Sequence, residues 1–242
     1  MAQSLNALAV GALVKDTGTL YNGKPIIWKI ADKGHTGYPS GAVTLITERI
    51  ISLKCFDAIE SGNSDGNRRS YGNNRWTLSN VRQWLNSQAT AGKWYSAQHG
   101  ADAAPTNANV WSNYNEYDTE AGFLSNFESD FRKAILDAVI RVAKNTVTDG
   151  GGYEDITRKV FLLSNTEVGL SNENSVAEGT LWSYFFSAAR RQCYPTAEAV
   201  SNSEYTNSSL NASSYWYWWL RTPYASYAYV ARFVNTDGGL DY

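Results

Sequence analysis

The chain of 242 residues is long enough for one large domain or two small ones, and its 43% of hydrophobic residues excludes wholesale disorder. The formal net charge of −2 argues against a dedicated nucleic-acid binder, because such proteins usually carry a basic surplus. No run approaches the roughly 18 apolar residues of a membrane span, so no membrane insertion is expected. Aromatic residues make up 14% and charged residues only 18%, which is typical of extracellular or virion proteins that bind other molecules.

The N-terminal third of the chain predicts an arm, a set of hairpins and a loop. Residues 1–10, MAQSLNALAV, are expected to form an arm and lack the basic and long apolar parts of a signal peptide. A protein that works outside its cell of origin would then leave by lysis or through a dedicated apparatus. Residues 11–51 hold short β-branched runs separated by Gly, Asn and Pro, which predicts hairpins. The polar, Gly- and Asn-rich residues 57–74 predict a loop.

Two or three helices and a buried strand are expected further along. In residues 76–87, apolar side chains recur at helical spacing behind Ser79, the expected N-cap. Residues 125–144 predict the longest helix, opened by a capping box at its first four residues. A second capping box at 175–178 predicts a helix through Ala188, and 158–164 predicts a strand. The expected apolar stripe of the longest helix is Phe127, Phe131, Ile135, Val139 and Val142.

No linker, tandem repeat or heptad divides the chain, so residues 11–242 are expected to form a single α+β domain. Its loops carry three groups of carboxylates that could hold calcium, but none follows the EF-hand pattern with its closing Glu. We interpret all three as solvated loop charge and leave a structural calcium ion open; no other cofactor is expected. The three groups are Asp57, Glu60 and Asp65; Glu116, Asp118 and Glu120; and Asp149, Glu154 and Asp155.

The sequence offers little support for catalysis. His35 and His99 are each isolated among Gly and polar residues, and no GxSxG turn accompanies them, so we interpret both as solvated or structurally bonded. Cys55 and Cys193 are too few for a disulfide framework; we interpret them as buried free thiols, and pairing stays open. Zinc-ligand spacing is absent from the sequence. Sequence spacing cannot identify a glycosidase carboxylate pair, so no enzymatic activity is predicted.

The aromatic tail, residues 213–242, carries the strongest signal. Strand alternation would place Trp216, Trp218 and Leu220 on one side, and Trp218, Trp219 and Leu220 are expected in the core. After Pro223, tyrosines alternate with Ala and Ser, the composition of adaptive binding loops. Arg221 is expected to pair with a carboxylate or with carbonyls beneath a loop. The expected ligand-binding residues are Tyr215, Tyr217, Tyr224, Ser226, Tyr227, Tyr229, Arg232, Asp241 and Tyr242.

Four stretches resemble a domain family that is frequent in bacterial prophages and gut phages. They are WTLSNVRQWLN (76–86), GFLSNF (122–127), KVFLLSNTEVG (159–169) and WWLRTP (218–223). The resemblance covers most of residues 10–242. It implies a C-type-lectin-like fold of the formylglycine-generating-enzyme type, with small antiparallel sheets, two or three helices and long loops.

Some members of that family are the variable proteins of diversity-generating retroelements. The resemblance implies that the segment after WWLRTP is the variable region, in which template adenines are misread. Substituting only the adenines of Asn codons cannot yield Trp, Gln, Glu, Lys or Met, and residues 224–242 contain none of these. Relatives continue to a closing strand that resembles GVRPA, whereas this sequence stops at Tyr242, so either the sequence is truncated or the last strand is missing or supplied otherwise. Cys193 precedes WWLRTP without a nearby partner cysteine, so the formylglycine-generating activity is not carried over.

Composition and resemblance together predict a phage tail-associated protein that binds a host-surface protein or glycan through a Tyr-rich face. The alternative is a structural tail or baseplate component that contacts other virion proteins through the same fold. A cell-wall hydrolase is a third, weaker hypothesis. The expected location is the virion tail, after synthesis in the host cytoplasm. The ligand, a homotrimeric state and the action of a retroelement stay open.

Overall fold

The computed structural model describes residues 4–242; residues 1–3 of the expected arm lie outside the described residues. The rest of the arm contains a short 3-10 turn, η1 (Leu5–Ala7). It rests on the first sheet, because the Lys33 ammonium donates hydrogen bonds to the carbonyls of Asn6 and Leu8.

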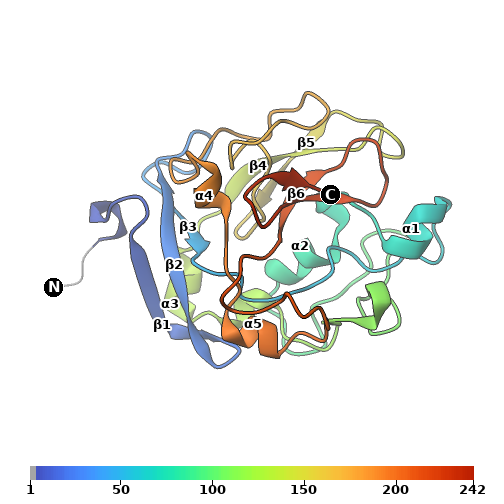
Figure 1. The fold of residues 1–242 in the computed structure, drawn as a ribbon, viewed down its shortest axis with the longest axis horizontal. Helices are drawn as coiled ribbons and strands as arrows, with labels where there is room; N and C mark the ends of the chain where they lie inside the picture. The colour runs from blue at the N-terminus through green and yellow to red at the C-terminus, as the bar shows by residue number, and fades with distance from the viewer. Residues whose placement is uncertain (1–3) are drawn as a thin grey trace.

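The hairpins predicted within residues 11–51 are confirmed as an antiparallel sheet, with strands in the order β1-β2-β3. These strands are β1 (Leu13–Tyr21), β2 (Lys24–Lys33) and β3 (Val43–Thr47). The sheet forms one side of the molecule in Figure 1. One face of the sheet packs on the core, where its side chains Tyr21, Ile26 and Ile30 are buried.

Two short helices follow, of which the sequence predicted one. Helix α2 (Asn80–Leu85) begins as expected after Ser79, whose side chain accepts a hydrogen bond from the Arg82 amide. Helix α1 (Gly66–Tyr71) lies within the stretch predicted as a loop, because the Asp65 carboxylate caps its first amides. Gly72 ends α1 at φ 79°, and a Cβ there would lie 2.5 Å from the Ala58 carbonyl oxygen. The 3-10 turn η2 (Trp76–Leu78) connects the two helices.

The single helix predicted over 125–144 is wrong. The segment forms η4 (Phe123–Asn126), α3 (Ser129–Ala134) and strand β4 (Ala138–Ala143). The β-branched residues Val139, Ile140 and Val142 favour a strand, in which Val139 is 55% exposed while Ile140 is buried. The expected capping box does not form, because the Ser125 hydroxyl donates to the Gly122 carbonyl instead.

The helix predicted from Ser175 to Ala188 and the strand predicted over 158–164 are also wrong. Only α4 (Ala188–Arg191) is helical, and Glu178 is buried in tertiary contacts instead of capping a helix. Strand β5 (Tyr153–Arg158), antiparallel to β4, ends where that predicted strand was to begin. The following amides, those of Lys159 and Val160, donate to the Asn86 side chain.

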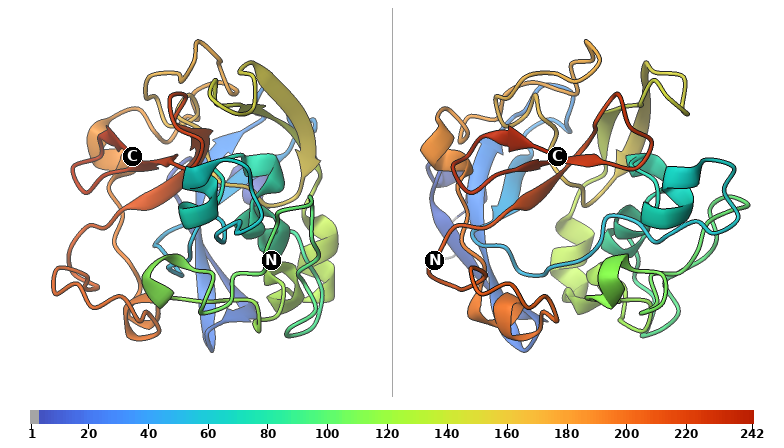
Figure 2. Two further views of the ribbon diagram at one scale, coloured as in Figure 1. Left: turned by 90° about the vertical axis from the view of Figure 1, so that its right-hand side faces the viewer. Right: turned by 45° about the vertical axis from the view of Figure 1, so that its right-hand side comes forward.

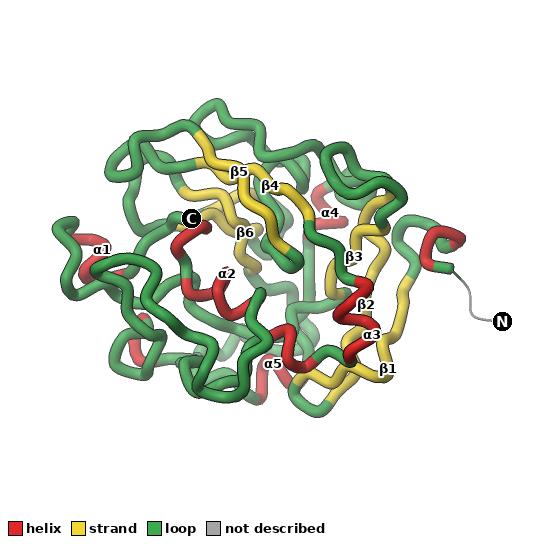
Figure 3. Tube along the Cα trace, turned by 180° about the vertical axis from the view of Figure 1, so that it is seen from behind, coloured by secondary structure: helices red, strands yellow, loops and turns green. Residues whose placement is uncertain are grey.

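The last strands form a third sheet in the order β6-β7-β8. Long loops connect the short elements of this α+β fold, which is largely green in the trace of Figure 3 and is seen from two further sides in Figure 2. Its small antiparallel sheets match the expected fold class. The remaining elements are β6 (Trp218–Pro223), β7 (Ala231–Val234), β8 (Leu240–Asp241), η3 (Trp111–Asn113) and α5 (Ala197–Ser201).

Candidate functional site

Strand β6 supplies the buried base of the candidate site. Leu220 and Arg221 are fully buried and Pro223 is buried, while Trp218 and Trp219 are half-buried. As predicted, the Arg221 guanidinium pairs with a carboxylate and with carbonyls. It contacts both Glu167 oxygens at 2.6 and 2.9 Å and donates to the carbonyls of Arg141, Leu162 and Glu178. All five guanidinium N–H groups therefore have partners.

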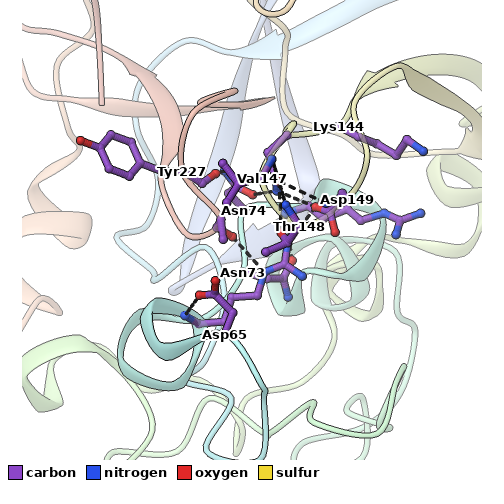
Figure 4. Close-up of polar contacts among 12 residues, drawn as sticks. Asp65, Asn73, Asn74, Lys144, Val147, Thr148, Asp149 and Tyr227 are labelled. Atoms are coloured by element: carbon purple, nitrogen blue, oxygen red, sulfur yellow. Dashed lines mark hydrogen bonds and ion pairs between the residues drawn. The ribbon is translucent and has the colours of Figure 1, made fainter.

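The segment that follows β6, residues 224–230, is held by side chains that bind its backbone. The Asn74 side-chain amide donates to the carbonyl oxygens of Tyr227 and Val230 at 2.8 Å each and to that of Tyr224 at 3.3 Å. The main-chain amide of Asn74 also donates to the Ala228 carbonyl. In Figure 4 the ring of Tyr227 points away from Asn74, whose contact is with the main chain. We call residues 224–230 the tyrosine loop.

Further side chains fix Asn74 and reach the tyrosine loop beside it. Asn145 donates to the Asn74 side-chain oxygen at 2.9 Å and to Asp149 at 2.6 Å. Arg68, from α1, donates to the Ala228 carbonyl at 3.0 Å and to Asp149 at 2.7 Å. Asn74 and Asn145 are fully buried, so this network is shielded from water. We call Arg68, Asn74, Asn145 and Asp149 the clamp.

A second anchor holds the start of the loop. The backbone and hydroxyl of Thr146 both donate to the Ala225 carbonyl at 2.9 Å, and the Ala225 amide donates to Glu173. Glu173 also pairs with Arg232 at 2.7 Å, and the Arg232 guanidinium lies 4.0 Å from the Tyr224 ring centroid. The arginine therefore joins a loop-anchoring carboxylate to an aromatic face.

Five tyrosine rings form a continuous cluster around the tyrosine loop. Tyr224 stacks on Tyr242 at 4.6 Å between centroids, and Tyr227 lies 5.1 Å from Tyr224. Tyr227 also contacts Tyr229, which stacks on Tyr71 at 4.9 Å. Tyr71, Tyr227 and Tyr242 are 47%, 39% and 56% exposed. We call these five residues the tyrosine cluster.

The structure brings together only part of the predicted ligand-binding set. Tyr224, Tyr227, Tyr229 and Tyr242 belong to the cluster, with Arg232 against it. Tyr215 instead contacts Tyr194, and Tyr217 contacts Trp216 and Phe233. Ser226 is exposed beside the cluster rings, and Asp241, half-buried, accepts a hydrogen bond from Asn235.

Sequence reasoning missed Tyr71 and the clamp. All lie more than 60 residues before the tail in sequence, with Asn145 and Asp149 on the β4–β5 connection. The only sequence signal is the run Ser70 to Asn74, SYGNN, where an aromatic residue precedes a glycine and two amides.

His35 is structurally bonded, in agreement with the prediction, whereas His99 lies beside a carboxylate without a hydrogen bond from its Nε2 atom. The Nδ1 atom of His35 lies 2.6 Å from Asp32, and its Nε2 atom lies 3.2 Å from the Thr180 hydroxyl. Burial alone would raise the Asp32 pKa, but hydrogen bonds from Ser183 and His35 outweigh it and lower the pKa. His99 places Nε2 3.0 Å from a Glu60 oxygen. The order hydroxyl, imidazole, carboxylate at His35 is that of a hydrolase triad, but its imidazole is buried.

The interpretation of the loop carboxylates as solvated is wrong for several of them. Asp57 and Glu60 are buried, and Asp57 accepts hydrogen bonds from the amides of Asn73 and Asn80. Burial raises the Asp57 pKa well above its usual value, against these hydrogen bonds. The Asp149 side chain is only 6% exposed and pairs with Arg68 in the clamp. These carboxylates are placed in buried contacts because each has N–H partners there, which sequence spacing does not reveal.

Metal ligands, the cysteines and membrane-spanning helices are the remaining features that the sequence raised. Within residues 4–242, the structure has no group of three or more His, Cys, Asp or Glu side chains arranged to hold a metal ion. Cys55 and Cys193 are free thiols, and burial raises their pKa to about 12 and about 11. No helix in the described part of the chain is long and apolar enough to cross a bilayer.

A family model described as a domain of unknown function, DUF6273, matches residues 41–242, and the chain belongs to that family. The match includes β6, the clamp and the tyrosine cluster, and leaves β1 and β2 outside. Neither a curated protein nor a solved structure matches the chain.

Proposed function

We propose that the protein is a binding module of a phage tail, built on a C-type-lectin-like scaffold, that contacts a host-surface protein or glycan through the tyrosine cluster. One observation carries the proposal: the tyrosine loop is held through its backbone. The carbonyls of Tyr224, Ala225, Tyr227, Ala228 and Val230 all accept hydrogen bonds from outside residues 213–242.

Backbone anchoring leaves the side chains of the loop free for recognition. Exposed substitutions usually change stability by no more than about 0.5 kcal/mol, whereas changes in a core cost several kcal/mol. Tyrosine offers a large amphipathic contact area with few rotatable bonds, and Ser226 adds an adaptable hydrogen-bonding group. A loop of this kind supports binding better than catalysis, for which ordered titratable groups would be needed.

The same arrangement suits diversification by a retroelement. The clamp residues lie outside the expected variable region, so replacing Tyr224, Ser226, Tyr227 or Tyr229 would leave every clamp hydrogen bond available. Arg232 is the exception, because its side chain pairs with the anchor residue Glu173. We therefore expect Arg232 to vary less than the four loop positions among copies of the gene from one lineage.

The test replaces Tyr224, Tyr227 and Tyr229 together with Ser. We expect the melting temperature to change little, because these rings contact mainly other tyrosines of the cluster and Arg232, and binding to the host surface to be lost. The measurement is adsorption of the fluorescent protein to a panel of bacterial strains and to immobilised bacterial glycans. The matched control replaces Tyr114, Tyr153 and Tyr205, which lie outside the cluster, with Ser and should keep binding.

Three outcomes would contradict this proposal. The first is unchanged adsorption of the folded cluster variant. The second is protection of the cluster tyrosines from iodination only in assembled tails, which would favour the structural tail role. The third is cleavage of purified cell walls that Thr180→Val abolishes, which would favour a hydrolase using Thr180, His35 and Asp32.

A further inference from the structure

Two arginines from different elements come close together without a carboxylate partner. Arg82 lies on α2, and Arg158 is the last residue of β5. The Asn86 side chain joins the two elements. Its amide donates to the Arg82 carbonyl at 3.0 Å, and its oxygen accepts hydrogen bonds from the amides of Lys159 and Val160 at 3.2 Å each. We call Arg82 and Arg158 the arginine pair.

The inner face of strand β5 shows why this arrangement is unusual. Alternate residues of the strand are half-buried, namely Glu154, Ile156 and Arg158, and the residues between them are exposed. Ile156 packs against the core, and Glu154 pairs with Arg75 at 2.7 Å. The acidic end of this face therefore meets an opposite charge. Its basic end, Arg158, faces another arginine.

The arginine pair has hydrogen-bond donors without acceptors. Within residues 4–242, the Arg82 guanidinium makes no hydrogen bond, and its Nε–H is buried. Arg158 uses one terminal nitrogen, which donates to the Thr157 carbonyl, but its Nε–H is also buried and lacks an acceptor in the described part of the chain. Every N–H of a guanidinium is a donor, and leaving a buried donor of a charged group unsatisfied is costly.

The carboxylates whose charges act on Arg82 are bonded to other groups. They are Asp102 and Glu154. Asp102 accepts a hydrogen bond from the Gln98 amide at 2.7 Å, and Glu154 accepts two from Arg75 at 2.9 and 2.7 Å. Neither acid accepts a hydrogen bond from Arg82, so the need of the arginine pair for an acceptor is not met by these side chains.

The charges of the arginine pair oppose each other. Burial and, after it, the positive charge of Arg158 lower the pKa of Arg82 to about 10, although Asp102 and Glu154 act in the opposite direction. Burial also lowers the pKa of Arg158. Both guanidinium groups are still charged at pH 7. An anion placed between them would relieve the repulsion and accept from the unused donors.

We propose that the arginine pair binds a phosphate group, with Arg82 and Arg158 each donating to its oxygens. A phosphate monoester carries about 1.5 to 2 negative charges at pH 7 and three acceptor oxygens, so it can match two guanidinium groups. A carboxylate carries one charge and would leave one arginine unmatched. Both arginines are half-buried and not enclosed, so a phosphate group on a larger molecule can reach them. The pair shares no residue with the tyrosine cluster or the clamp, so this site is additional to the proposed recognition surface.

The test follows the Nε–H signals of Arg82 and Arg158 by NMR during titration with inorganic phosphate or glucose 6-phosphate at constant ionic strength. We expect both signals to shift together and to saturate with one dissociation constant. Arg82→Gln and Arg158→Gln should each weaken binding by about tenfold or more. Arg141→Gln is the matched control and should keep the affinity, because Arg141 lies on β4 of the same hairpin and its donors are taken by Asp155. The ligand that binds more tightly shows whether the site takes free phosphate or a phosphate group on a sugar.

Arg158→Glu separates loss of binding from loss of folding, because it places a carboxylate beside Arg82. We expect this variant to lose phosphate binding while its melting temperature in chloride buffer stays the same or rises. The proposal would be overturned by the lack of a saturable shift in the wild type, or by unchanged affinity in Arg82→Gln. Equal weakening by Arg141→Gln would also overturn it by indicating a general charge effect, and acetate that binds as tightly as phosphate would indicate a carboxylate site. None of these readouts involves the tyrosine cluster.

Discussion

Strand β6 and the tyrosine loop are consecutive in sequence, but β6 forms its contacts through side chains and the loop forms them through its main chain. In β6, side chains carry the structure, above all Arg221 with its five buried donors. In the tyrosine loop, main-chain carbonyls carry the structure, and the Tyr227 ring points away from the Asn74 side chain that binds its carbonyl (Figure 4). The change occurs within a few residues of Pro223. A protein can therefore keep one segment fixed and let the next one vary.

The largest expected effect on stability comes from replacing Arg221 in β6. Arg221→Met leaves Glu167 as a buried charge without its partner, and we expect a loss of about 3–5 kcal/mol in the free energy of unfolding. The measurement is a denaturant melt. The double variant Arg221→Met with Glu167→Leu removes both charges and should recover part of the loss. If Arg221→Met alone costs less than about 1 kcal/mol, side chains of β6 do not carry the structure.

The next largest effect on stability is expected from replacing Asn74, the clamp residue that binds the tyrosine loop. Asn74→Asp keeps the shape of the side chain but turns its donor into an acceptor facing the carbonyls of Tyr227 and Val230. We expect a loss of about 3 kcal/mol and faster hydrogen exchange in residues 224–230. Asn207→Asp is the control, because only the side-chain oxygen of Asn207 is used, as acceptor from the Ser209 amide. Equal stability of the two variants would show that the loop does not depend on the clamp.

Arg221 and Asn74 also show how far the sequence predicts the structure. The hairpins of residues 11–51, the cap at Ser79 and the role of Arg221 were predictable because each depends on local pattern or on one residue type. The 125–144 helix failed because its apolar spacing suits a helix and a strand alike, and tertiary contacts at Ile140 and Val142 decide between them. Asn74 and Tyr71 could not be assigned because their partners are about 150 residues away.

A smaller effect, on the pH dependence of stability, is expected from Glu178. This residue accepts hydrogen bonds from Thr222 in β6 and from the Ala143 amide. Burial raises the Glu178 pKa, although Arg221 and these hydrogen bonds oppose the shift. The folded state then binds this proton more tightly than the unfolded state, so the contribution of Glu178 to stability falls as pH rises through its folded-state pKa. Glu178→Gln cannot titrate. The free energy of unfolding of the wild type minus that of Glu178→Gln should therefore decrease from pH 4 to pH 7, as measured by melts across that range. A flat or rising difference would mean that Glu178 is ionised without cost beneath β6.

The smallest effect on stability is expected at Tyr71, the cluster member that lies outside the tail. Its ring is 47% exposed and stacks on Tyr229, so Tyr71→Ser should change the free energy of unfolding by no more than about 0.5 kcal/mol. If the cluster is one recognition surface, the same change should weaken adsorption to a bound strain or glycan, even though Tyr71 lies in α1. Tyr153→Ser is the control, because Tyr153 is equally exposed on β5 and contacts Arg141 instead of the cluster. Adsorption that survives Tyr71→Ser but is lost on changing the tail tyrosines would confine recognition to the tail. If Tyr71→Ser lowered the free energy of unfolding by several kcal/mol, Tyr71 would belong to the scaffold. The tyrosine cluster would then include a side chain that the fold requires, and not only side chains that are free to vary.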